Sequence, residues 1–247
     1  MKNAALNNIR IVLSHTSHAG NIGATARAMK TMGLESLYLV NPHSFPDETA
    51  NIRAVSARDL LARAKVCNSI NDALGGTVLA AALTSRSREL EHEAYDARSG
   101  ARLLLEHAMH HSVALVFGTE TSGLTASEVS KCTLKITIPT NPEYTSLNLA
   151  SAVQVMAYEL RMAVLDIDRT QTAKPLQYAP ATLDETELFY QHLEQVMIRT
   201  DFLDPLRPKK LMQRIRRLFS RARLEKEEVN ILRGVLNAVE KQLPGKS

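Results

Sequence analysis

The chain has 247 residues, of which 45% are hydrophobic and 23% charged, enough for an α/β core with an appendage. No apolar run approaches the length of a membrane span, and residues 1–10 lack the apolar segment of a secretory signal, so we expect a cytoplasmic protein. The two cysteines, Cys67 and Cys132, lie far apart, which argues against a disulfide framework and a cysteine zinc site, and we expect both to be small buried residues. The net charge is +4, and the positive excess gathers near the C-terminus.

The first predicted unit is a strand, a helix and a second strand. Residues 9–13 alternate and are rich in β-branched side chains, residues 21–32 form an alanine-rich helical run closed by Gly33, and residues 37–40 are again apolar. This pattern is typical of a βαβ unit and therefore of a parallel sheet.

The loop between the first strand and helix carries Gly20 and Gly23, which let the backbone approach another group closely, and Arg27 follows one helical turn later. The spacing is neither GxGxxG nor GxxxxGK[ST], so neither a dinucleotide nor a P-loop nucleotide is indicated. His15 and His18 lack a third ligand nearby, so we interpret them as polar loop groups and expect no metal.

The middle of the chain continues the alternation, which gives about six strands and an α/β class. Residues 47–64 and 98–110 are predicted helices, the second with His107, His110 and His111 on a solvated face. Predicted strands cover residues 65–70, 77–83, 113–117 and 133–138. The polar residues Thr84, Ser85, Arg86, Ser87 and Arg88 follow one of these strands. A turn with Gly118, Glu120 and Gly123 follows another. Because ligands of parallel sheets bind beyond the carboxyl ends of the strands, these turns are candidate ligand contacts.

The stretch from Ile138 to Leu160 breaks an apolar strand into a turn-rich loop and then begins a long helix. Pro139 and Pro142 cannot continue a strand, so the backbone between Ile138 and Thr145 is expected to be irregular. Ser146 and Asn148 then stand at the helix N-terminus, where free amides favour an electron-rich ligand group. The alternative is a crossover helix with ordinary capping.

The C-terminal quarter differs in composition from the rest of the chain. Residues 1–165 are expected to form the α/β domain, residues 166–181 a linker, and residues 182–247 a basic helical extension. Thr182 to Glu185 form a capping-box pattern that opens a helix with Phe189, Leu193, Val196 and Met197 on one face. The last predicted helix presents Val229, Leu232, Leu236 and Val239.

Between these two helices, a helix predicted from Pro205 carries a basic stripe beside an apolar one. The stripe comprises Arg207, Lys210, Arg214, Arg217 and Arg221, and the apolar residues are Leu211, Ile215, Leu218 and Ala222. Cations in a row repel one another, whereas a polyphosphate releases counterions when they neutralise it, so RNA or DNA is the expected partner. The alternative is a solvated helix face. With few aromatic residues and no tryptophan, phosphate and shape contacts are expected to outweigh base stacking.

Three motifs together resemble a known family. The segments NIGATARAMKTMGL, LVFGTETSGLT and IPTNPEYTSLNLASAVQVMAYEL are similar to the signature blocks of the SPOUT-class methyltransferases, in the branch that methylates the ribose 2′-hydroxyl of RNA. With RRLFSRARLEKEEVNILRG, the chain resembles bacterial members that methylate cytidine or uridine at position 32 of the tRNA anticodon loop. The resemblance implies a trefoil-knotted α/β domain, a homodimer, and S-adenosylmethionine as methyl donor.

The resemblance also assigns residues. It implies cofactor contacts at Leu83, Thr84, Ser85, Gly118, Ile138, Thr145, Ser146 and Leu147. It implies that Asn21, Arg27, Glu120, Ser146 and Asn148 surround the transferred methyl and the target ribose. Candidate RNA contacts are Arg86, Arg88 and the five cations of the basic stripe. Thr119 departs from the arginine that relatives commonly carry at this position.

We expect Arg27 to position or polarise the ribose hydroxyl and its neighbouring phosphate, with Glu120 and Asn21 orienting its guanidinium. Two alternatives remain open at this point. The same fold can methylate ribosomal RNA or another tRNA ribose, or the chain can be an RNA-binding module without catalysis.

Overall fold

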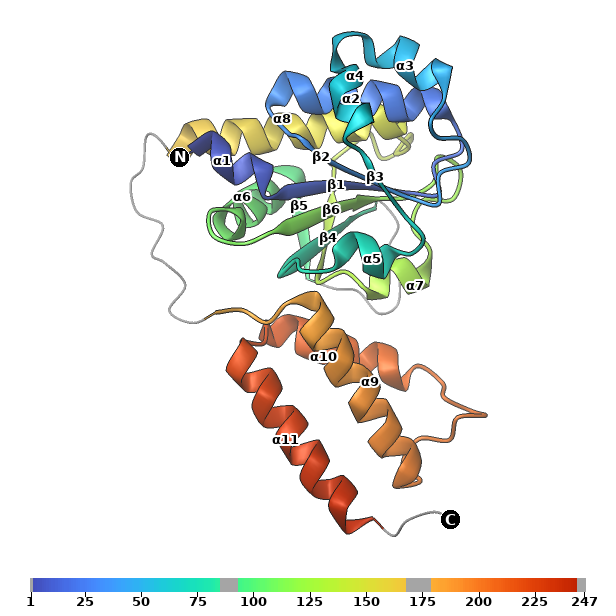
Figure 1. Cartoon of the computed structure of the whole chain (residues 1–247), viewed down its shortest axis with the longest axis vertical. Helices are drawn as coiled ribbons and strands as arrows, with labels where there is room; N and C mark the ends of the chain where they lie inside the picture. The colour runs from blue at the N-terminus through green and yellow to red at the C-terminus, as the bar shows by residue number, and fades with distance from the viewer. Residues whose placement is uncertain (1, 85–92, 168–178, 244–247) are drawn as a thin grey trace.

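The computed structural model describes residues 2–84, 93–167 and 179–243, in which seven parallel strands form one sheet of order β3-β2-β1-β6-β4-β7-β5 (Figure 1). The strands are β1 (Ile9–Ser14), β2 (Ser36–Val40), β3 (Lys65–Cys67), β4 (Leu79–Leu83), β5 (Ala94–Asp96), β6 (Val113–Phe117) and β7 (Leu134–Thr137). Their side chains alternate between two cores: Leu115 of β6 faces one and Val116 the other. The sheet is therefore covered on both faces, as parallel sheets generally are.

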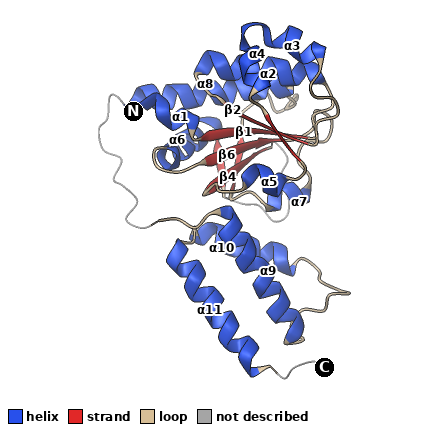
Figure 2. Cartoon of the chain, viewed as in Figure 1, coloured by secondary structure: helices blue, strands red, loops and turns tan. Residues whose placement is uncertain are grey.

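Helices make up the two outer layers (Figure 2). The larger layer contains α1 (Lys2–Asn7), α2 (Ala19–Met32), α3 (Glu48–Ala54), α4 (Arg58–Ala62), α6 (Ala97–Ala108) and α8 (Leu149–Ile167). The opposite face carries α5 (Ile70–Leu74) and α7 (Ala126–Ser130). Within the described residues, no helix combines the length and apolar character needed to cross a bilayer.

The parallel α/β class and the opening βαβ unit are confirmed, and Gly33 ends α2 in the left-handed region at φ 81° as its position predicted. The helix predicted over residues 47–64 is wrong as one element. It consists of α3, a 3₁₀ turn at Val55–Ala57 and α4, with Val55 at φ 53° where the helix breaks. The strand predicted over residues 65–70 ends at Cys67, because Ser69 forms a capping box with Asp72 and begins α5.

The C-terminal part contains α9 (Leu183–Arg199), α10 (Leu211–Ala222) and α11 (Lys226–Gln242) around a small core. Phe189 and Val196 of α9 pack there with Val229 and Leu236 of α11, as predicted, and Thr182 forms the expected capping box with Glu185.

The helix predicted from Pro205 begins only at Leu211, which leaves Arg207 and Lys210 in the preceding loop. The apolar face predicted for this helix is also partly wrong. Met212, Ile215 and Phe219 pack on the small core, whereas Leu218 is 53% exposed. The Phe219 ring lies edge-on against Phe189, with the centroids 5.0 Å apart, and this contact fixes the rotation of α10.

The helical part contacts the sheet domain through specific bonds. The Leu183 amide donates to the Thr77 carbonyl at 2.8 Å, and the Gly76 amide donates to the Asp184 carboxylate at 2.8 Å. Farther along α9, Glu187 accepts from Lys131 of the sheet domain at 2.9 Å and from both terminal nitrogens of Arg216 at 2.6 and 2.8 Å. A cluster of three charged residues thus links the end of α7 with α9 and α10.

Two expectations about individual side chains are corrected. Cys132 is buried as predicted, and burial raises the pKa of its thiol to about 12, but Cys67 is only half-buried on the edge strand β3. Of the histidines placed on a solvated face, His110 is exposed whereas His107 is half-buried where α6 ends against the helical part. Burial lowers the pKa of His107, so its imidazole is neutral at pH 7.

Candidate active site

A pocket of about 340 Å³ lies at the carboxyl ends of the neighbouring strands β6, β4 and β7. Seven of the eight predicted cofactor contacts line it: Leu83, Thr84, Gly118, Ile138, Thr145, Ser146 and Leu147. The eighth, Ser85, lies outside the described residues. Three turns far apart in the sequence therefore converge on one hollow, as expected for polar turns that follow neighbouring parallel strands.

Two hydrogen bonds, one between backbone groups and one from a side chain, hold two of these turns together. The Thr84 amide donates to the Ile136 carbonyl at 3.1 Å, and the Thr137 hydroxyl donates to the Thr84 carbonyl at 3.0 Å. The path of the chain just after β4 is thus fixed by β7.

The third turn folds back on itself at Gly118. Thr119 and Gly123 exchange backbone hydrogen bonds at 3.0 and 3.3 Å, and Gly123 stands at φ 67°. A Cβ on Gly118 would lie 2.1 Å from the Gly123 carbonyl carbon, so only glycine fits this closure. Thr119 is engaged within the turn itself, since its hydroxyl lies 2.7 Å from that of Ser122.

The loop from 138 to 148 is irregular, as its prolines predicted. The Asn141 side chain accepts from the Glu143 amide at 3.1 Å, which turns the chain toward Thr145. Asn148 then caps α8, since its side-chain oxygen accepts from the Ala150 amide at 3.0 Å and the Ser151 amide at 3.3 Å.

Glu120 is a carboxylate that lines the pocket. Its carboxylate accepts four hydrogen bonds, from the amide and hydroxyl of Ser17 at 3.0 and 2.7 Å, from the His18 amide at 3.2 Å, and from Asn21 Nδ2 at 2.9 Å. Partial burial by itself raises the pKa of Glu120, but the bonds from Asn21 and Ser17 outweigh it and lower the pKa to about 2. Glu120 is therefore ionised and saturated with donors at pH 7, which suits a positioning group and not a proton acceptor.

Hydrogen bonds join three of the five candidate catalytic residues. Asn148 Nδ2 donates to Asn21 Oδ1 at 3.1 Å, so Glu120, Asn21 and Asn148 make a continuous chain, and Ser146 lines the same pocket. Arg27 lies six residues after Asn21 on α2, about 9 Å along the helix axis. It is exposed and makes no hydrogen bond or ion pair within the described parts of the chain. The expectation that Glu120 and Asn21 orient its guanidinium is therefore wrong for a single chain: they bind each other.

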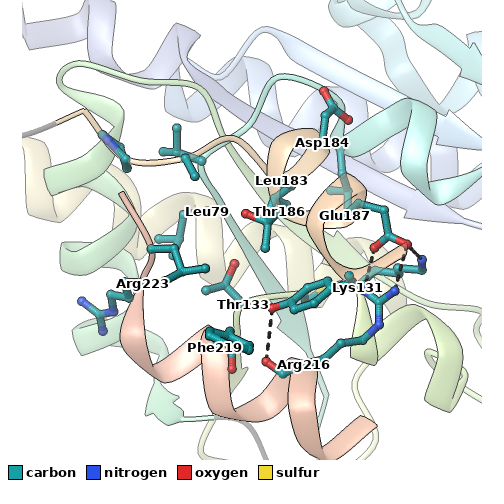
Figure 3. A pocket seen from close by; sticks show the side chains of 18 of the residues that line it. Leu79, Lys131, Thr133, Leu183, Asp184, Thr186, Glu187, Arg216, Phe219 and Arg223 are labelled. Atoms are coloured by element: carbon teal, nitrogen blue, oxygen red, sulfur yellow. Dashed lines mark hydrogen bonds and ion pairs between the residues drawn. The ribbon is translucent and has the colours of Figure 1, made fainter. Parts of the chain in front are cut away.

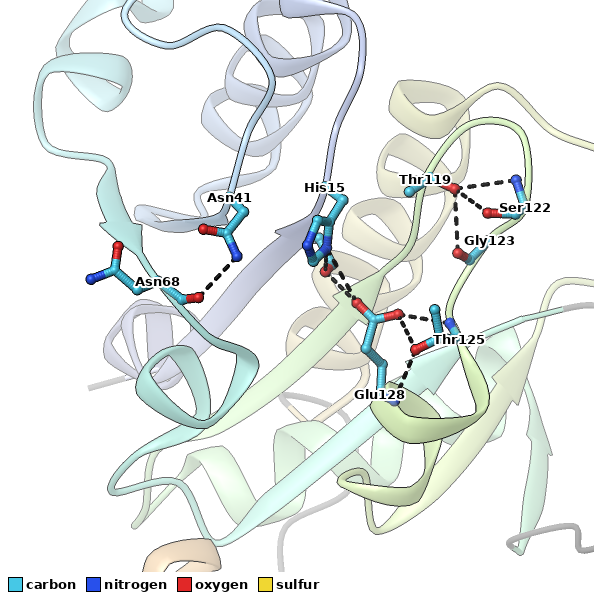
Figure 4. A network of polar contacts seen from close by, with 9 residues as sticks. His15, Asn41, Asn68, Thr119, Ser122, Gly123, Thr125 and Glu128 are labelled. Atoms are coloured by element: carbon cyan, nitrogen blue, oxygen red, sulfur yellow. Dashed lines mark hydrogen bonds and ion pairs between the residues drawn. The ribbon is translucent and has the colours of Figure 1, made fainter.

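Sequence reasoning missed a second polar network, in which His15 and Thr125 lie against Glu128 (Figure 4). Buried Ser14, at the end of β1, donates to Glu128 of α7, and its hydroxyl lies 2.9 Å from His15 Nδ1. Glu128 also forms the capping box of α7 with Thr125. The T-x-x-E spacing at 125–128 was the available signal. His15, predicted to be a polar loop group, contacts Ser14 and Glu128 in this network. Among the residues described, no group of three or more metal-ligand side chains occurs.

A second cavity, of about 300 Å³, lies between the sheet domain and the helical part, at the opposite end of β4 (Figure 3). Its wall is largely apolar, with Leu79, Leu183 and Phe219, and the Glu187 ion pair closes one end. None of the predicted site residues lines it.

The predicted RNA contacts are divided in space. Arg214 and Arg221 are exposed on α10, Arg207 and Lys210 are exposed in the loop before it, and Arg217 is half-buried, its Nε making no hydrogen bond to the described residues. Arg86 and Arg88 lie outside the described residues.

The fold is that of the SpoU class of methylases: the SpoU rRNA Methylase family model matches residues 8–158, and the model described as tRNA methyltransferase TrmJ, C-terminal domain, matches residues 184–247. The tRNA (cytidine/uridine-2′-O-)-methyltransferase TrmJ of Yersinia enterocolitica is 49% identical over 96% of this chain and 93% of its own length. The chain therefore belongs to the TrmJ family within the SpoU methylases.

Solved structures agree with this assignment. The crystal structure of TrmJ from Z. mobilis ZM4 matches with a TM-score of 0.82 and 30% identity, and the match covers 94% of this chain and 98% of that one. The fold is also shared with the SpoU methyltransferase AviRb from Streptomyces viridochromogenes, solved in complex with AdoMet, at a TM-score of 0.50 and 20% identity over 65% of this chain and 60% of that one.

Proposed function

We propose that this protein transfers the methyl group of S-adenosylmethionine to the ribose 2′-hydroxyl of cytidine or uridine at position 32 of the tRNA anticodon loop. The observation that carries the proposal is the pocket at the ends of β4, β6 and β7, where seven predicted cofactor contacts meet beside the Glu120–Asn21–Asn148 chain. The names of the TrmJ relatives supply the nucleotide class and the tRNA.

The pocket suits S-adenosylmethionine in size and in chemistry. Its volume of about 340 Å³ falls within the range of small-molecule sites. The turn at Gly118 brings backbone groups to the surface that can bind an adenine edge, and Thr84, Thr140 and Thr145 add hydroxyls. We assign residues 1–165 to cofactor binding and residues 182–247 to RNA binding; α8 continues to Ile167, so the predicted linker 166–181 begins two residues too early.

S-adenosylmethionine, when bound, supplies an already activated methyl group, so the protein's task is to orient the ribose, and the proton that the 2′-hydroxyl loses passes to solvent water. Glu120 is too acidic to accept it, and it orients Asn21 and the 17–18 turn. Asn21 in turn orients Asn148, because its side-chain oxygen accepts a hydrogen bond from Asn148 Nδ2. We assign Ser146 and Asn148 to the target ribose, and the exposed Arg27 to its adjoining phosphate.

A homodimer and a knotted chain complete the proposal. Tyr158 and Leu165, 49% and 44% exposed on α8, give that helix an apolar outer edge suited to a second copy of the chain. Strand β7 lies between β4 and β5, both of which precede it, so the chain enters a gap between strands already placed. This order supports the trefoil knot expected from the family.

The test uses the purified chain, S-adenosylmethionine carrying a labelled methyl group, and an unmodified tRNA transcript. Digestion and mass spectrometry should find one 2′-O-methylated pyrimidine at position 32. A transcript with a 2′-deoxynucleotide at that position should accept no label, and light scattering should give the mass of a dimer.

Two outcomes contradict the proposal. Label in ribosomal RNA or at another tRNA ribose would keep the chemistry and replace the substrate. Absence of S-adenosylmethionine binding by calorimetry, with and without tRNA, would leave an RNA-binding module without catalysis.

A further inference from the structure

The connection between α9 and α10, residues 200–210, lies beside a hollow that the site described above does not use. It projects sideways from the helices (Figure 1) and, together with the start of α10, borders an open hollow of about 590 Å³. Phe202 lines this hollow together with Arg207, Lys209, Lys210 and Arg214.

The sequence fixes this loop by one buried anchor. The amides of Phe202 and Leu203 both donate to the Met197 carbonyl, at 2.9 and 3.0 Å, which ends α9. Leu203 is then only 4% exposed, whereas the adjacent Phe202 is 69% exposed. Because Leu203 is anchored in the core, the backbone at Phe202 is fixed and the Phe202 ring points to solvent.

The charge around the ring is strongly positive. Four cations line the hollow and Asp204 is its one lining carboxylate, with one oxygen engaged by the Leu206 amide at 2.9 Å. Among the residues described, the side chains of Arg207, Lys209 and Arg214 make no ion pair. An exposed apolar ring surrounded by unneutralised cations indicates a ligand that is flat and apolar on one surface and anionic on another.

We propose that this hollow binds an unpaired nucleotide of the RNA substrate, with its base stacked on Phe202 and its flanking phosphates on Arg207, Lys209 and Arg214. The proposal rests on the proposed function and adds to it a second contact point for RNA. Every base has a π-face, so stacking tolerates any sequence, whereas a base within a duplex cannot offer its face. The proposal adds base stacking to the phosphate and shape contacts that the sequence led us to expect.

The chain contains no tryptophan, so Phe202→Trp introduces a single tryptophan at the proposed contact, which can be excited apart from the tyrosines. A single-stranded oligoadenylate should quench its emission in a saturable way, and a blunt-ended RNA duplex of the same length should not. Ile231→Trp, at a residue 65% exposed on α11, is the matched control and should respond to neither RNA. Equal quenching by the duplex, or by polyglutamate, would overturn the proposal.

Affinity measurements give an independent test. Phe202→Ala should weaken binding of the oligoadenylate and of tRNA by about 5-fold to about 150-fold, and Phe202→Trp should restore it. Leu206→Ala is the control, because Leu206 is 90% exposed in the same loop but does not line the hollow. Phe202→Ala should keep the wild-type slope of log affinity against log salt, whereas Lys209→Ala should reduce that slope by about one.

The two proposals fail separately. If Phe202→Ala binds both RNAs with wild-type affinity while the wild-type chain methylates tRNA, the nucleotide site is wrong and the proposed function stands. If oligoadenylate quenches Phe202→Trp while the wild-type chain methylates no tRNA, the nucleotide site stands and the proposed function is wrong.

Discussion

Gly118 is the residue on which the shape of the pocket depends most directly. A Cβ at this position would lie within 2.1–2.5 Å of the Gly123 and Leu124 backbone, which cannot move without opening the turn. We therefore expect Gly118→Ala to abolish S-adenosylmethionine binding measured by calorimetry. Gly234→Ala is the control: nothing lies within 4 Å of its added Cβ, and it should leave binding unchanged and stabilise α11 by about 0.5–1 kcal/mol. Wild-type cofactor affinity in Gly118→Ala would contradict this pocket.

At the same scale, Glu120 separates positioning from proton transfer. Glu120→Gln replaces an oxygen that accepts hydrogen bonds with an amide that donates, so Asn21 or Ser17 loses its partner. We expect kcat for methyl transfer to fall roughly 100-fold, with the affinity for S-adenosylmethionine little changed. Because the pKa of Glu120 is about 2, its titration should not appear in the wild-type rate profile above pH of about 5.

The control for this variant is Glu143→Gln, an exposed carboxylate on the neighbouring loop, which should keep the parental kcat. A rate profile that rises through a pKa assigned to Glu120 near neutral pH would make it a proton acceptor and not a positioning residue.

At the scale of elements, α2 carries Asn21 and Arg27 and is held by its contact with α3. A Cβ on Gly23 would lie 2.1 Å from the Ala50 carbonyl oxygen, whereas a Cβ on Gly20 meets only side-chain atoms at 3.7 Å. We expect Gly23→Ala to destabilise the protein by about 1–3 kcal/mol in urea denaturation and Gly20→Ala to be tolerated. Equal stability of the two variants would mean that the helices do not need this close approach.

Sequence patterns predicted most of the elements that build the pocket because each is encoded locally. The apolar runs of β4, β6 and β7 end in polar turns, and parallel strands bring those turns to one edge. What the pattern could not fix were choices made by tertiary contacts. Residues 211–219 have apolar side chains that fit two overlapping helix faces, and only packing against Phe189 selects Met212 and Phe219. For the same reason, the sequence predicted Arg27 as the partner of Glu120, whereas the structure shows Ser17 and Asn21. That pairing depends on how the 17–18 turn approaches the end of β6.

At the scale of the whole molecule, the helical part is held against the sheet domain by a partly buried charge cluster. Burial by itself raises the pKa of Glu187, but Arg216 and Lys131 outweigh it and lower the pKa to about 2. Arg216 also stacks over the Tyr190 ring, 4.5 Å from its centroid. The cluster therefore fixes how the basic helices are oriented relative to the active site.

The stability that this cluster contributes should depend on pH with a defined sign. The pKa of Glu187 is lowered from 4.5 to about 2 on folding, so its contribution is complete well above pH 4.5 and is lost as the pH falls toward about 2. Allowing for solvent screening at this partly exposed site, we expect Glu187→Gln to cost about 1–2 kcal/mol at pH 7. Denaturation of wild type and variant should converge at the acid end, because the wild-type carboxyl is then protonated. Glu194→Gln, two turns along α9, should match wild type at both pH values, and a gap for Glu187→Gln that persists in acid would show that packing, not charge, joins the two parts.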